Sequence, residues 1–154
     1  MQMSRGDIEA LRRVDGLDRA LERLQGMLSG ASLQPTYLTA PLTSTSWDGD
    51  AHSTTAKTLI DLSAVFGVPA GVRLVLVSIS LRDSGSAASD CWLALSPNDT
   101  AKQGMLVSCL PVNDRSNRTS AIVPCNADGD IYYQIAASGS GTMDVYLQIW
   151  GYGW

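Results

Sequence analysis

The residue best suited to acid–base chemistry is His52, the single histidine of the chain. It lies in a stretch rich in Gly, Asp, Ser and Thr, with Asp50 and Ser53 close by. The members of a Ser–His–Asp triad meet in space and not along the chain, so this adjacency is weak support for nucleophilic catalysis. No nucleophile-elbow pattern accompanies it. We therefore predict a protein that is not an enzyme, with no catalytic residue and no cofactor.

Acidic residues flank a glycine at two places, Asp48/Asp50 and Asp128/Asp130. Carboxylate oxygens are the ligands that hard cations such as Ca²⁺ prefer. Neither loop carries a full set of ligands, however, and Asp-Gly is also common turn chemistry. The sequence favours turns without a metal, and a cation site is the alternative.

The cysteines and the arginines of one loop could also carry chemistry. Cys91, Cys109 and Cys125 are odd in number, and their spacing matches no zinc or redox motif. We expect reduced thiols that are mostly buried, since free Cys behaves as a small hydrophobic residue. Arg115 and Arg118 form a small basic loop, which either stays solvated or contacts an acidic neighbour.

Aromatic residues gather at the end of the chain, at Tyr146, Trp150, Tyr152 and Trp154. Rings of this kind bury a large area at low entropic cost. They can pack within their own domain, form subunit contacts or provide a platform for a ligand such as a sugar. All three alternatives stay open, and these residues are our candidates for a subunit or ligand contact.

Composition narrows the class of protein. The chain has 154 residues, of which 45% are apolar and 17% are charged, and its formal net charge is −4. A net negative charge argues against nucleic acid as a partner, because phosphate binding needs a basic surface. No apolar run reaches the roughly 18–20 residues that span a bilayer, and the first residues show no secretion signal. We expect a protein made in a cytosol, with neither nucleic acid nor a membrane as a partner.

The first 30 residues have a helical hydrophobic period. Steps of four and three form a heptad seam, typical of a short coiled coil that gathers copies of the chain. The alternative is one amphipathic helix that lies on its own β domain, since Ile8 and Leu11 fall outside the seam. The predicted oligomerisation residues follow Ala10 and are Val14, Leu17, Leu21, Leu24 and Leu28.

Beyond a linker at residues 31–36 the period changes to two, which predicts a β domain over residues 37–154. The run 72–81 is almost continuously apolar, as in a strand covered on both faces. Residues 138–141 (SGSG) read as a hairpin connection. Eight short strands without intervening helices indicate an all-β antiparallel sandwich of the jelly-roll type. The expected strands are 36–43, 56–62, 72–81, 91–95, 105–110, 119–124, 130–137 and 142–150.

The stretch GDIYYQIAASGSGTMDVYLQIWGYGW, residues 129–154, resembles the end of small structural proteins of tailed bacteriophages and phage-like particles. In those proteins a hairpin of this kind leads to a Trp-Gly-Tyr terminus. The resemblance implies a virion component, often a trimer, displayed outside the shell or at a fibre tip. It implies no catalytic residues.

Together these patterns predict a virion structural protein, assembled in the host cytoplasm, whose partners are copies of itself and capsid or other virion proteins. The leading hypothesis is an oligomeric capsid decoration or head-spike protein. The alternative is a fibre or tail-tip module that binds a host surface glycan or protein. A bacterial lectin-like or adhesion domain is a third hypothesis, and it would need an export route.

Overall fold

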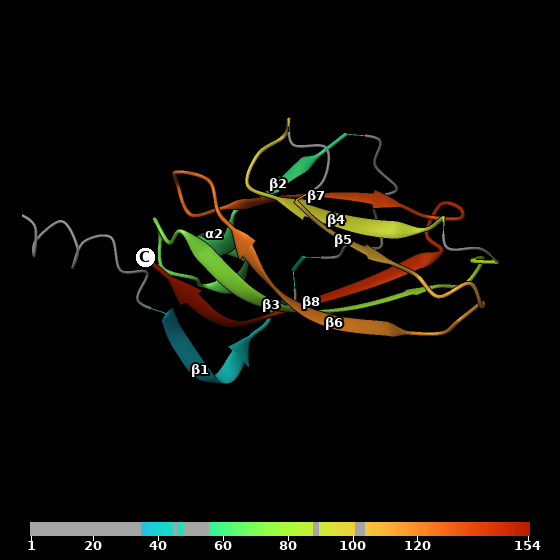
Figure 1. Ribbon diagram of the computed structural model, residues 1–154, viewed down its shortest axis with the longest axis horizontal. Helices are drawn as coiled ribbons and strands as arrows, with labels where there is room; N and C mark the ends of the chain where they lie inside the picture. The colour runs from blue at the N-terminus through green and yellow to red at the C-terminus, as the bar shows by residue number, and fades with distance from the viewer. Residues whose placement is uncertain (1–34, 45, 48–55, 88–89, 101–103) are drawn as a thin grey trace, which may run out of the picture. The chain divides into compact units, whose positions relative to one another are not determined.

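The computed structural model describes residues 35–44, 46–47, 56–87, 90–100 and 104–154, which form one unit that begins at Pro35 (Figure 1). This unit is built almost entirely of strands, with a single short helix among the described residues. The elements are β1 (Pro35–Leu42), β2 (Thr58–Ile60), α2 (Leu62–Phe66), β3 (Leu74–Asp83), β4 (Trp92–Ser96), β5 (Met105–Ser108), β6 (Asn117–Pro124), β7 (Ile131–Ala136) and β8 (Met143–Gly153).

The strands form two antiparallel sheets of four strands each, ordered β1-β8-β3-β6 and β2-β7-β4-β5. The pairing is nested: β1 pairs with β8, β2 with β7, β3 with β6, and β4 with β5. Strands that are consecutive in the chain therefore pass from one sheet to the other, except at the β4–β5 hairpin. The predicted antiparallel β fold is confirmed in this form, as two four-stranded sheets with little helix.

One hydrophobic cluster joins the two sheets in a sandwich-like arrangement. Val77 and Ile79 of β3 and Ile149 of β8 belong to the same buried cluster as Leu93 of β4 and Ile135 of β7. Alternate residues along β7 and β8 enter this core, as the period of two predicted. Dense packing of these branched side chains supplies most of the driving force that holds the sheets together.

Each of the eight predicted strands is present, although several ends differ by a few residues. The first strand begins at Pro35, so the last two residues of the predicted linker belong to β1. The predicted coiled coil at residues 1–30, with its seam residues, lies outside the described residues.

The helix α2 is not among the sequence-based expectations. Asp61 caps its first turn, since its side chain accepts a hydrogen bond from the Ala64 amide at 2.9 Å. Gly67 ends it in the left-handed conformation. Because the helix has five residues, it is too short to show a helical period, and only its caps could have announced it.

The described unit differs from two predictions about individual strands. In β3, Val75, Val77, Ile79 and Leu81 are buried, but the alternate residues are only half-buried, so one face alone is fully covered within the described unit. The SGSG segment at 138–141 is not a hairpin, because β7 and β8 belong to different sheets. An almost continuous apolar run does not distinguish a doubly covered strand from one whose second face is left open.

The SGSG connection crosses between the sheets at a buried carboxylate. Asp83, at the end of β3, is 1% exposed. Its oxygens accept hydrogen bonds from the backbone amides of Gly85 and Ser138 at 2.8 and 3.0 Å, and from the side-chain hydroxyls of Ser138 and Thr142. These bonds tie the turn that leaves β7 to the end of β3, which fixes the start of β8 in the other sheet.

Candidate functional site

The side of the sheet β1-β8-β3-β6 that faces away from the core is here called the outer face. Its residues on the central strand β3 are Leu74, Leu76, Ser78 and Ser80, all partly exposed. Residues paired across neighbouring strands share a face of the sheet. The register therefore gives the composition of the outer face row by row, and that composition changes along the strands from apolar to polar.

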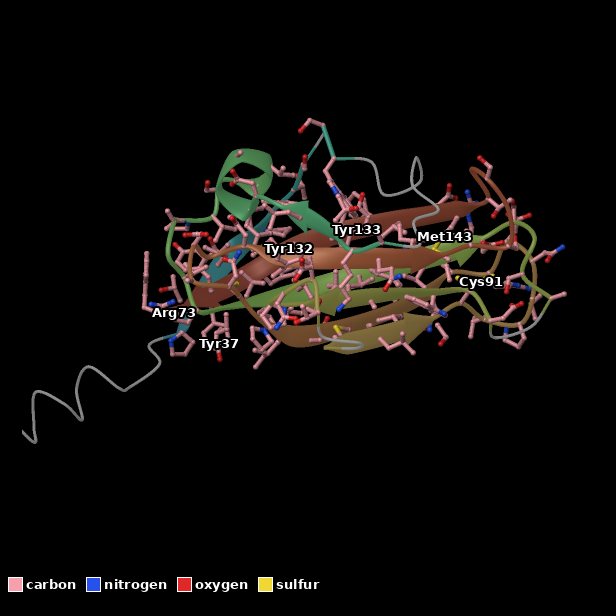
Figure 2. The ribbon with its side chains drawn as sticks, turned by 90° about the horizontal axis from the view of Figure 1, so that it is seen from above. Tyr37, Arg73, Cys91, Tyr132, Tyr133 and Met143 are labelled. Atoms are coloured by element: carbon pink, nitrogen blue, oxygen red, sulfur yellow. The ribbon has the colours of Figure 1, made fainter. Side chains whose placement is uncertain are left out.

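The apolar row consists of Tyr37, Gly151, Leu76 and Ile122, which are paired in succession across all four strands. Tyr37 is 73% exposed and Ile122 is 64% exposed. Tyr37 lies at the end of the sheets that also carries Arg73, and Cys91 and Met143 lie toward the other end (Figure 2). A tyrosine and an isoleucine so exposed on one row form a surface suited to contact with another apolar surface.

Gly151 shapes the centre of the apolar row. A Cβ atom there would lie 2.8 Å from the carbonyl oxygen of Thr36, so glycine lets β1 approach β8 closely. The missing side chain leaves a small groove of about 90 Å³. Its lining is mostly apolar and comprises Pro35, Thr36, Tyr37, Leu74, Leu76, Ile122, Gly151 and Tyr152.

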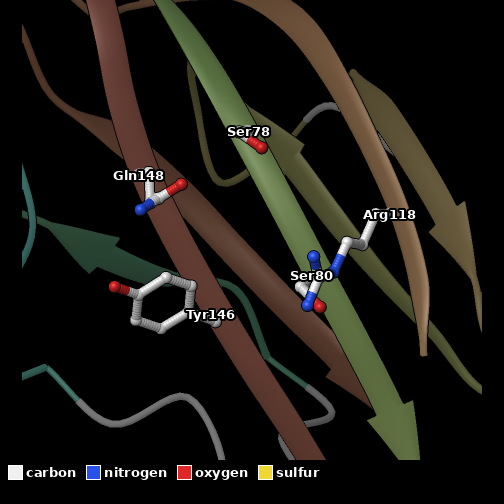
Figure 3. A pocket seen from close by; sticks show the side chains of 5 residues that line it. All are labelled: Ser78, Ser80, Arg118, Tyr146 and Gln148. Carbon is white, nitrogen blue, oxygen red and sulfur yellow. The ribbon is translucent and has the colours of Figure 1, made fainter. Parts of the chain in front are cut away.

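A second, larger depression lies farther along the outer face and is here called the polar pocket. It has a volume of about 390 Å³ and is lined by Ser78, Ser80, Arg118, Tyr146 and Gln148. Ser80 pairs with Tyr146 on one side and with Arg118 on the other, and Ser78 pairs with Gln148. Figure 3 shows the small serines on β3 between the longer side chains of β8 and β6.

Arg118 is the one charged residue in the described lining of the polar pocket. Arg118 has no ion-pair partner within the described part of the chain, where the ion pair found joins Arg82 to Asp144. That pair is two register positions beyond the row of Ser80, and it occupies the nearest carboxylate of β8. None of the five lining residues is acidic, so a guanidinium faces the pocket without a competing carboxylate in its lining.

The four aromatic residues near the end of the chain do not form one cluster, and their surroundings differ. Tyr146 is 51% exposed and lines the polar pocket. Trp150 sits where the β3–β8 register shifts and is 36% exposed. Tyr152 packs against the core and meets Trp154 edge-on, with ring centroids 6.3 Å apart, while Trp154 stays half exposed. Three of the four rings thus leave a third or more of their surface exposed in the described unit.

The acidic turn at Asp128 and Asp130 has a structural role. The Asn126 side chain accepts hydrogen bonds from the backbone amides of both residues, at 2.9 and 2.8 Å. Asp130 in turn accepts one from the Leu62 amide at 2.9 Å, at the start of α2. Burial and, to a lesser degree, the neighbouring carboxylates raise the pKa of Asp130, although the Leu62 bond opposes them. Among the described residues no group of side chains has the composition of a metal site.

Cys91, Cys109 and Cys125 are free thiols, the first two buried and the third half-buried. The Cys109 amide donates a hydrogen bond to the Cys91 carbonyl at 2.8 Å, so these two residues are neighbours across the β4–β5 hairpin. Burial raises the pKa of Cys109 to about 11, with a smaller contribution from Cys91. Thiols in this state are poor nucleophiles.

Of the remaining residues singled out from the sequence, the structure places the two arginines differently from the prediction and does not describe the others. Arg115 and Arg118 do not share a loop, because Arg118 belongs to strand β6 and points toward Ser80. The expectation of a common basic loop is therefore wrong. His52, Asp48, Asp50 and Ser53 lie outside the described residues, as do the seam residues Val14 to Leu28.

Sequence reasoning did not single out Ser78, Ser80, Gln148, Tyr37 or Ile122, which form much of the two outer-face features. The period of two correctly separates inward from outward positions on β8. What it lacks is the register: only the pairing of β1, β8, β3 and β6 places these outward residues side by side. The nested order joins strands that are far apart in the chain, so no local pattern announces it.

Comparison of the chain with models of known protein families and with curated proteins gives no match. Within the part of the chain that the structure describes, no helix has the length and apolar character needed to cross a membrane.

Proposed function

We propose that this chain is a non-enzymatic virion structural protein that assembles with copies of itself and decorates a phage shell as a capsid decoration or head-spike protein. A trimer is the state that the resemblance of residues 129–154 favours. The observation that carries the proposal is the exposed apolar row of Tyr37, Leu76 and Ile122 on the outer face. We propose that this apolar row binds a second copy of the chain.

The place where the chain enters the sheet supports this choice of occupant. Pro35 begins β1 and pairs with Gly153, two register positions from the apolar row. The predicted heptad seam ends at Leu28, a few residues before Pro35. Each copy gathered by that seam would lead along its chain into β1, the strand that contributes Tyr37 to the apolar row. Each weak contact then gains from a high effective concentration.

The strand order supports the proposed class of protein. Eight strands with nested pairing in two four-stranded sheets follow the jelly-roll plan, which viral capsid proteins and lectins both use. Because a fold hosts many functions, this likeness alone does not choose between them. The polar pocket gives specific support to the alternative, a fibre or tail-tip module that binds a host surface glycan or protein.

Light scattering on the purified full chain tests self-assembly. We expect the mass of an oligomer for the native chain and the mass of a single chain for the Leu21→Asp/Leu24→Asp double variant, because charge on the seam opposes helix association. Ile122→Glu should also weaken the oligomer, since it places a carboxylate in the apolar row. The matched control is Val112→Glu, at a loop residue with 54% exposure, and it should leave the mass unchanged.

A native chain with the mass of a monomer would refute the proposal. An oligomer that loses its mass in the seam variant but not in Ile122→Glu would refute the role of the outer face. The number of copies in a purified particle then separates the two virion roles, because shell decoration needs many copies and a fibre tip needs few.

A further inference from the structure

The polar pocket has the geometry of a trough across the sheet. Ser78 and Ser80 form a low floor on β3, Tyr146 and Gln148 stand on one side and Arg118 on the other. The two sides belong to strands separated by β3, so they lie roughly 10 Å apart at the usual strand spacing. A gap of this width, with hydroxyl groups at its base, accommodates one small ring.

The lining defines which chemical groups would bind. The Arg118 guanidinium offers paired donors that match a carboxylate. The Tyr146 ring offers a flat apolar surface, and the hydroxyl and amide groups of Ser78, Ser80 and Gln148 offer both donors and acceptors. We propose that the polar pocket binds a sugar ring that carries a carboxylate, such as a uronic acid residue of an acidic glycan. This inference extends the alternative function and does not depend on self-assembly.

Other anionic ligands fit this site less well. Phosphate sites commonly use backbone amides at a helix N-terminus or in a loop. Here the β3 backbone is paired on both sides, with β6 and with β8, so side chains alone must bind the ligand. A peptide that adds as a strand needs a sheet edge, whereas the pocket is centred on an interior strand. A ring with hydroxyl groups and one carboxylate uses every group in the lining.

Calorimetric titration of the full chain with methyl glucuronide and with methyl glucoside tests the proposal. The two sugars differ only in the group at C6, a carboxylate or a hydroxymethyl. We expect weak binding of the glucuronide and at least about tenfold weaker binding of the glucoside, since a hydrogen bond to a charged group contributes that much to affinity. Arg118→Gln should remove the difference between the sugars. Arg115→Gln, at an exposed arginine outside the pocket, should preserve it.

The proposal would be overturned by no binding of the glucuronide, by equal binding of both sugars by the native chain, or by the same loss in Arg115→Gln as in Arg118→Gln. N-acetylglutamate amide provides a carboxylate without a ring. Should it bind as tightly as the glucuronide, the pocket recognises acidic protein side chains and the assignment to a sugar fails. Each titration reports binding per chain and so does not depend on assembly. A chain that is monomeric and still binds the glucuronide would contradict the proposed assembly but not the proposed sugar site.

Discussion

Replacing Asp83 with Asn tests whether the buried carboxylate holds the two sheets in register. Asp83 accepts four hydrogen bonds, two on each oxygen, and it is too deeply buried for water to replace a lost acceptor. An asparagine amide keeps one acceptor oxygen and presents an NH₂ group to two donors. If the NH₂ group replaces the first oxygen, the Ser138 hydroxyl can rotate to accept from it, but the Gly85 amide loses its acceptor. If it replaces the second oxygen, the Thr142 hydroxyl can accept, but the Ser138 amide loses its acceptor.

The expected cost follows from that geometry. A buried donor left without a partner costs about 1–3 kcal/mol, and loss of a charged acceptor adds about 1 kcal/mol, so Asp83→Asn should lower the free energy of unfolding by about 2–4 kcal/mol. With a slope of roughly 2 kcal/mol per molar urea for a domain of this size, the urea midpoint should fall by about 1–2 M. Native and variant chains must be compared at equal protein concentration, because assembly also contributes to stability.

The pH dependence adds a second readout. Burial raises the pKa of Asp83, but the hydrogen bonds from Ser138, Gly85 and Thr142 outweigh it, and the net pKa lies below its ordinary value. A carboxyl whose pKa is lowered by folding stabilises the protein above its unfolded-state pKa of about 3.9, and this contribution is lost as the pH falls through the folded-state value. The advantage of the native chain over Asp83→Asn should therefore be full at pH 7 and shrink below about pH 4.

The control is Asp144→Asn, which removes an ion pair with Arg82 whose side chains are 47% and 48% exposed. Exposed pairs contribute about 0–1 kcal/mol, so this variant should unfold almost like the native chain. A cost below about 1 kcal/mol for Asp83→Asn, or a cost that is the same at pH 3 and pH 7, would contradict the proposed role of Asp83.

Two further expectations concern the thiols and one turn. Burial, with a smaller contribution from Asp130, raises the pKa of Cys125 to about 12. An aromatic disulfide reagent at pH 8 should therefore label the thiols of the native chain far more slowly than those of the urea-unfolded chain. Equal labelling rates would contradict the burial of the thiols. Gly129 has a φ of 96°, and an added Cβ would lie 2.7 Å from the Gly71 amide nitrogen, so Gly129→Ala should cost about 1–3 kcal/mol in urea unfolding. Gly141→Ala shares a positive φ but meets open space, and a cost as large there would remove the close approach as the cause.

Strand positions were predictable because each strand carries its own signal. In β8, Met143, Val145, Leu147 and Ile149 alternate with polar or aromatic residues, and all four are buried as predicted. The sheet to which a strand belongs has no such local signal. Residues 138–141 have the composition of a hairpin, yet bonds from Ser138 and Thr142 to Asp83, more than fifty positions away, carry the chain across to the other sheet.

The outer face lacks a local sequence signal for the same reason, because its features arise only when distant strands pair. An exposed tyrosine or isoleucine is unremarkable alone, since much of any protein surface is apolar. The nested order changes its meaning, because it sets Tyr37 of the first strand and Ile122 of the sixth on one row with Leu76 between them. Four residues farther along β3 it sets Arg118 and Tyr146 on opposite sides of Ser80. Neither arrangement improves the core, and these two surfaces are the features on which the proposed self-association and the proposed binding of an acidic sugar depend.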